Sequence, residues 1–405
     1  MILFSLLGCG ALAGAPLDPA CPTELSITTE LSITQGLSIT HGHSTSAGAP
    51  GGFALLAGPS AAAKPKVRFQ GKNHAFDKLP DEVGEAARAS LDQWLPWIEA
   101  HDFHAVLSAD QSTLLVLPKK SLVSKREKLV EEVLERFDEL APRLDSLAEE
   151  ARPNWPAQDL PAAALESLPG GDRETAVLVE LMGPKLSQEL GEYLAQIHTD
   201  LRGWASTSLL GGVVSDVPPL SVTVDGDGQE EYEAENEVVH RLVRTLLARR
   251  FGLLPYTVQS GLAWSLEEEL CGDHYCFPFR NEFIFETEHG AWAADLKARY
   301  RSRRKEPVSA EELFEFERGT FDLELAQTAF GFGRYLIEER PDDLPLVLDA
   351  LRSEWAGTAI RVDGSNWEYE PDREVAPLRV AEVCAEILGQ DFAQDVTDYF
   401  RKGLR

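Results

Sequence analysis

Hydrophobic and polar positions along the first half of the chain follow two alternating patterns. Short apolar runs that end at Pro or Gly predict buried strands, and apolar residues spaced three and four apart predict amphipathic helices. Strands are predicted at 111–117, 175–181 and 220–224, and helices at 121–140 and 184–200. Because each of the first two strands is followed by a helix, this part of the chain predicts a small α/β layer.

From about residue 230 the apolar spacing is helical almost throughout. An apolar helix that includes Val238 ends near Gly252, and a second helix opens at Gly261. Further helices are predicted over 286–300, 321–339, 341–352, 377–389 and 391–404. The whole chain is therefore expected to be α+β and mainly α, with the small α/β layer followed by a helical lobe.

The first 63 residues differ in composition from the rest. They contain no Lys or Arg and are rich in Gly, Ala, Ser and Thr, which predicts a disordered low-complexity leader. Leu6-Leu7-Gly8-Cys9 resembles the box at which bacterial lipoprotein signals are cleaved and the new terminal Cys is acylated. The apolar region before it is short and lacks basic residues. The resemblance implies export, a lipid anchor at Cys9 and a location in the bacterial cell envelope.

Charge restricts the classes of partner. The chain has 38 Lys and Arg against 67 Asp and Glu, a formal net charge of −29 over 405 residues. Nucleic-acid binding is not expected, because it normally requires a basic surface. No apolar stretch reaches the ~18 residues that a transmembrane helix needs, so no membrane span is expected.

The chemically informative segment is 235–269, in which an apolar helix is followed by Leu254-Pro255 and then by Gly261-Leu262-Ala263. This arrangement resembles the active-site region of gluzincin-type, thermolysin-like zinc metallopeptidases, which carry H-E-x-x-H and then Leu-Pro-x-Trp-x-x-Glu-Gly-Leu-Ala. In that family the two His and the second Glu hold Zn²⁺, and the first Glu activates the metal-bound water. The resemblance implies a gluzincin-like helical domain over 220–405, after an α/β subdomain over 64–219.

Aligned on the two framework motifs, this chain departs from the family at most functional positions. His240 stands at the first His, Arg241 at the general base, Arg244 at the second His and Ser260 at the third ligand. An arginine cannot ligate zinc, and two guanidinium groups would repel a divalent cation. We therefore expect a degenerate metal site with no catalytic residue, and no zinc, the cofactor that the family uses.

Three alternatives remain open in this region. In a second register, Asn236 replaces the first His, so that Glu237 is the base and His240 the second ligand. Ser260 and His240 could form a nucleophile–base pair. Cys271 and Cys276 could form a local disulfide, bind metal together with His274, or remain unrelated thiols.

The sequence thus predicts a non-catalytic relative of a secreted metallopeptidase, whose cleft binds a polypeptide or glycan or serves as scaffold. One alternative is an active zinc-dependent hydrolase that uses His240, Glu237 and the Cys271–Cys276 segment. The other is a structural protein of the cell envelope. The sequence identifies neither a substrate nor a partner.

Overall fold

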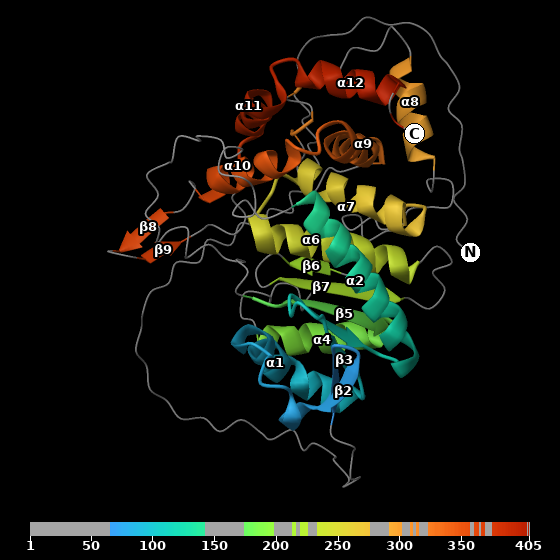
Figure 1. The fold of residues 1–405 in the computed structure, drawn as a ribbon, viewed down its shortest axis with the longest axis vertical. Coiled ribbons are helices and arrows are strands. Elements are labelled where there is room, and N and C mark those ends of the chain that lie inside the picture. The colour runs from blue at the N-terminus through green and yellow to red at the C-terminus, as the bar shows by residue number, and fades with distance from the viewer. Residues whose placement is uncertain are drawn as a thin grey trace, which may run out of the picture. The chain divides into compact units, whose positions relative to one another are not determined.

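The chain is described by a computed structural model. It describes residues 65–141, 174–197, 213–215, 219–225, 233–275, 291–301, 308–310, 313–315, 323–356, 360–363, 366–368, 375–402 and 404. These residues belong to one compact unit, which is α+β and mainly helical (Figure 1). A small mixed sheet comes first and a helical region follows, as the sequence predicts.

The sheet has seven strands in the order β2-β1-β3-β4-β5-β7-β6. Their bounds are β1 Lys66–Phe69, β2 Lys72–Ala75, β3 His104–Leu107, β4 Thr113–Leu117, β5 Ala176–Met182, β6 Val213–Ser215 and β7 Leu220–Asp225. The pairs β1–β3, β4–β5 and β5–β7 are parallel, and the pairs β1–β2, β3–β4 and β6–β7 are antiparallel. A separate two-stranded sheet pairs β8 (Ile360–Asp363) with β9 (Asn366–Glu368).

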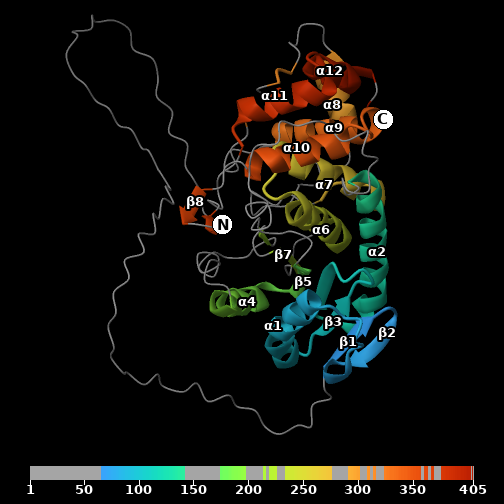
Figure 2. The same ribbon diagram turned by 60° about the vertical axis from the view of Figure 1, so that its left-hand side comes forward.

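Helices cover both faces of the seven-stranded sheet. Alternate residues of a strand point to opposite faces, so Leu114 and Val116 pack in one core while Leu115 and Leu117 pack in the other. The first core lies under α1 (Glu85–His101) and α4 (Pro184–Ile197). The second lies under α2 (Val123–Leu140) and α6 (Ala234–Phe251) and continues into the helical lobe (Figure 2).

The helical lobe is built on α6. Helix α7 (Tyr256–Cys271) packs on α6, and α9 (Leu323–Glu339) packs on α7. Among the described residues the lobe also contains α8 (Trp292–Arg301), α10 (Leu344–Ala356), α11 (Pro377–Leu388) and α12 (Phe392–Lys402). Gly261 and Gly333 let the backbones of α7 and α9 nearly touch, because a Cβ on Gly261 would lie 2.1 Å from the carbonyl oxygen of Ala329.

The structure extends and corrects several expectations. Every predicted strand and helix has a counterpart, but α7 begins at Tyr256, directly after Pro255, rather than at Gly261. The elements β1, β2, α1 and β3 were not predicted. The subdomain boundary expected between residues 219 and 220 falls inside the sheet, because β7 lies between β5 and β6. The predicted leader lies outside the described residues, and none of the described helices has the length and apolarity of a membrane span.

Candidate functional site

The segment that carries the family resemblance forms two adjacent helices. Helix α6 ends at Gly252, whose φ of 74° only glycine adopts without strain, and Pro255 precedes the first turn of α7. Asn236 contacts Glu267 and Arg244 contacts Gln259, so the two helices run antiparallel. Because α6 lies between the sheet and α7, it is buried on nearly all sides, and its polar residues must find partners inside the protein.

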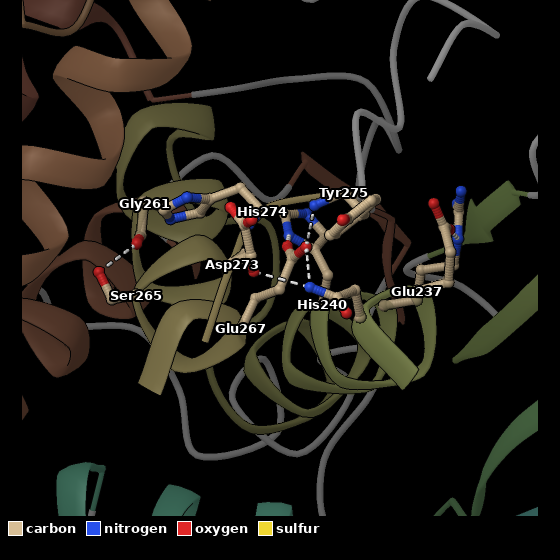
Figure 3. A network of polar contacts seen from close by, with 10 residues as sticks. Glu237, His240, Gly261, Ser265, Glu267, Asp273, His274 and Tyr275 are labelled. Atoms are coloured by element: carbon tan, nitrogen blue, oxygen red, sulfur yellow. Dashed lines mark hydrogen bonds and ion pairs between the residues drawn. The ribbon is translucent and has the colours of Figure 1, made fainter. Parts of the chain in front are cut away.

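Glu267 is the centre of the polar cluster between the two helices. Its carboxylate accepts hydrogen bonds from Asn236 Nδ2 at 3.1 Å and from the backbone N–H of Tyr275 at 2.6 Å. The other carboxylate oxygen lies 3.1 Å from His240 Nδ1 (Figure 3). Asn236 Nδ2 also donates to the carbonyl oxygen of Asp273 at 2.7 Å. This single carboxylate therefore ties α6, α7 and the segment after α7 together, and its side chain is fully buried.

His240 is neutral in this environment. Burial lowers its pKa well below the usual value, and the positive charges of Arg244 and Arg241 lower it further. A neutral imidazole next to a carboxylate carries its proton on the near nitrogen, so Nδ1–H donates to Glu267. The other nitrogen, Nε2, has no hydrogen-bond partner within the described part of the chain. The ring lies against Trp264, with 5.1 Å between the ring centroids.

Arg241 and Arg244 are buried among compensating groups on the same two helices. Arg241 Nε donates to Glu237 one turn before it, at 2.6 Å, and both side chains are 2% exposed. Arg244 donates to Gln259 Oε1 at 3.4 Å and lies over the ring of Tyr256. A buried guanidinium needs such partners, since leaving either charge unpaired in the interior costs several kcal/mol. Both side chains thus belong to the internal packing of α6.

The other predicted site residues are only partly drawn together. Ser260, Trp264 and Glu267 share the face of α7 that meets α6, because they are spaced four and three apart. Ser260 is fully buried, and its hydroxyl has no hydrogen-bond partner among the described residues. Ser260 and His240 therefore form no hydrogen bond with each other, and the nucleophile pair stays a prediction.

The cysteine segment is described only in part. Cys271 lies at the end of α7 and forms no disulfide with another described residue. Burial raises the pKa of its thiol to about 12, so the thiol form is protonated at neutral pH. His274 is fully buried in an aromatic cluster and stacks on Trp292 with 4.2 Å between ring centroids. Cys276 and Cys9 lie outside the described residues, so the disulfide, the three-residue metal site and the lipid anchor stay predictions.

The donor set does not fit zinc in either register. Arg241 and Arg244 cannot ligate a cation, and in the second register the amide of Asn236 is already bonded to Glu267 and Asp273. Within the described part of the chain, no three His, Cys, Asp or Glu side chains are placed to hold one ion. His240 has the geometry of a ligand, with one nitrogen held by a carboxylate and the other without a partner among the described residues.

Sequence reasoning missed Glu267, the residue that organises the cluster. It stands in the run Glu267-Glu268-Glu269, which looks like a solvated helix end. The available signal was its spacing of seven residues from Ser260, which places it on the same helix face. Comparisons with known proteins give no further guide, since no family model matches the chain and no curated protein matches it significantly.

Proposed function

We propose that this protein is a catalytically inactive relative of gluzincin-type metallopeptidases, in which the α6–α7 pair has become a structural centre. The observation that supports the proposal is the set of hydrogen bonds that the buried Glu267 carboxylate accepts. Its carboxylate binds both Asn236 and His240, and two arginines occupy the positions of the family's base and second ligand. The helices that would present a catalytic zinc are instead held together by internal hydrogen bonds and ion pairs.

Any function would then lie in binding rather than in hydrolysis. The chain would keep the helical lobe as a binding surface for a polypeptide or glycan, or as scaffold in the cell envelope. Export and lipidation at Cys9 belong to the same proposal, since the parent family here is a secreted one.

One observation favours a second candidate, a metal-dependent hydrolase with a non-standard ligand set. Histidines that ligate metals usually donate their other ring N–H to a carboxylate, and His240 does so to Glu267. Its Nε2 is buried and without a partner among the described residues. The metal content of the protein separates the two candidates.

The first experiment measures zinc, by mass spectrometry, in the full chain purified without chelator or metal-affinity resin. The proposal expects far less than one zinc per chain and no release of fluorescent peptides from a labelled casein. About one zinc per chain, bound stoichiometrically to folded protein, would refute it and support the second candidate. If zinc is found, a His240→Gln variant serves as the control. It should lose the metal if His240 is a ligand, as the second candidate requires.

A repair experiment tests the resemblance itself. Arg241→Glu, Arg244→His and Ser260→Glu together rebuild the zinc ligands in the first register, whereas Asn236→His with Ser260→Glu rebuilds them in the second. The second register is the one in which the two ligand positions already meet at Glu267. We expect one folded variant to bind zinc more tightly than the parent chain. If both variants fold, as shown by circular dichroism, and neither binds, the resemblance to gluzincins is wrong.

A further inference from the structure

A pocket of about 330 Å³ opens at the edge of the sheet, away from the α6–α7 cluster. It is lined by the first residues of β1 and β3, by Asn73 of β2, and by the start of the helical segment that leads into α2. The lining residues that bear on its chemistry are Lys66, Arg68, Asn73, His104, Lys120 and Ser124. Its volume is at the lower end of the range for small-molecule sites.

The topology of the sheet brings these residues together. Val67 and Phe69 of β1 point into the core under α1 and α4, so Lys66 and Arg68 point to the face where α2 lies. Strand β1 is parallel to β3, and β3 is antiparallel to β4, with His104 opposite Leu117. The chain leaving β4 therefore carries Lys120 to the edge where β1 and β3 begin.

The pocket concentrates positive charge on a strongly acidic protein. Lys66, Arg68 and Lys120 line it against one acidic residue, Asp102, whereas the whole chain has a net charge of −29. Arg68 donates to Glu127 at 2.5 Å, which fixes its guanidinium beside the pocket. Within the described part of the chain, neither Lys66 nor Lys120 forms an ion pair. Two lysines thus remain available to a negative ligand.

The backbone at the same place also favours an anion. A short 3₁₀ turn, Lys120–Leu122, leads directly into α2, and neither it nor α2 has a side-chain cap or an acidic residue in its first turn. Within this turn the backbone N–H groups of Leu122 and Val123 already donate to the carbonyl oxygens of Lys119 and Lys120. The start of a helix nevertheless carries partial positive charge, so a lysine there is disfavoured unless an anion is present. The lysine side chains and the helix start therefore act in the same direction.

We propose that this pocket binds a small phosphorylated molecule. A phosphate carries more negative charge and more acceptor oxygens than a carboxylate, and it can engage Lys66, Lys120 and Arg68 together. Asn73 and Ser124 supply uncharged hydrogen-bonding groups, and the partly exposed Pro65 and Val123 offer an apolar surface to the rest of the ligand. The proposal does not depend on the function proposed for the α6–α7 pair.

The test is isothermal titration calorimetry of the full chain with phenyl phosphate, and with benzoate and inorganic phosphate as comparisons. The pocket variant is Lys66→Gln with Lys120→Gln. The control is Lys128→Gln with Lys185→Gln, which removes the same charge from two exposed lysines outside the pocket. All four lysines are on the surface, so both variants should fold.

We expect saturable binding of one phenyl phosphate per chain, with weaker binding of benzoate. The pocket variant should lose about tenfold or more in affinity, and the control variant about twofold or less. Absence of saturable binding by the parent chain would overturn the proposal. An equal loss in the two variants would overturn it as well, because it would show general charge attraction rather than a site.

Discussion

The buried carboxylate of Glu267 allows a direct test of the structural role given to the α6–α7 pair. Glu267→Gln keeps the shape of the side chain and removes its charge. Glu269→Gln makes the same change two residues further along α7, where the carboxylate pairs with Arg136 at 2.7 Å and is about one-third exposed. The two variants therefore differ only in the surroundings of the carboxylate.

The expected magnitude follows from the partners of each group. Glu267 accepts from Asn236, His240 and the Tyr275 N–H, and hydrogen bonds to a charged group contribute about 1.5–3 kcal/mol each against about 0.5–1.5 for neutral ones. The amide N–H₂ of Gln would also face a donor, His240 Nδ1–H. Losing the charge also removes a negative group from the neighbourhood of Arg241 and Arg244, of which Arg241 keeps its ion pair with the buried Glu237. A neutral Gln costs less to bury than a charged carboxylate, which offsets part of this loss. We therefore expect Glu267→Gln to lower the free energy of unfolding by about 2–4 kcal/mol.

The control should lose much less. The Arg136–Glu269 pair is partly solvated and screened, so Glu269→Gln should lower the free energy of unfolding by less than about 1 kcal/mol. The assay is urea unfolding of both full-length variants and the parent, followed by circular dichroism at neutral pH. If Glu267→Gln is no less stable than Glu269→Gln, Glu267 does not organise the cluster and the structural role proposed for it is refuted.

Two further predictions concern the packing and the protonation of the same helices. Gly261→Ala gains about 1 kcal/mol of helix propensity, but its Cβ would lie 2.1 Å from the Ala329 carbonyl oxygen, so we expect a net loss of about 2 kcal/mol or more in urea unfolding. Gly84→Ala, at the N-cap of α1, has a Cβ that would come no closer than 3.5 Å to another group, so it should cost only the cap preference, about 1 kcal/mol or less. Equal effects of the two substitutions would contradict the close crossing. The folded state lowers the pKa of His240, so as pH falls the unfolded state binds the proton first. The free energy of unfolding therefore falls as pH drops below the unfolded-state pKa of about 6.5, by up to about 1.4 kcal/mol per pH unit. Urea unfolding between pH 7 and pH 5 should show a shallower fall for His240→Gln, and identical slopes would mean that His240 is not buried in its neutral form.

The parts of the fold that could be predicted are those with long and consistent patterns. Strand β4 is a continuous apolar run, and α2 and α9 show regular helical spacing over many residues. The bounds of these three elements lie within two residues of the prediction. Strands β1 and β3 have four residues each, too few for alternation to be recognised. Helix α1 contains Pro96, which normally ends a helix, and only its packing against the sheet overrides that preference.

The candidate site could be predicted in its positions but not in its interactions. The framework motifs located α6 and α7, and helical spacing placed Asn236 and His240 on one face. Glu267 is held by Asn236 of α6, far away in the sequence, and by the backbone N–H of Tyr275 beyond the end of α7, and neither contact leaves a local pattern in the sequence. The ion pair of Glu237 with Arg241 has the common i,i+4 spacing, which does not by itself tell a buried pair from an exposed one.

The geometry of His240 and the charges around it bear on metal binding in opposite ways. Its Nδ1 is held as in a metal ligand, and leaving Nε2 buried without a partner costs about 1–3 kcal/mol. A cation at Nε2 would remove that cost. It would, however, stand close to Arg241 and Arg244, whose charges already disfavour a single proton on the same ring. A divalent ion carries twice the charge of that proton, so the repulsion it meets is larger, and the two carboxylates of the cluster are already engaged by hydrogen bonds and an ion pair. The electrostatic argument therefore outweighs the geometric one, and the inactive relative remains the better-supported proposal.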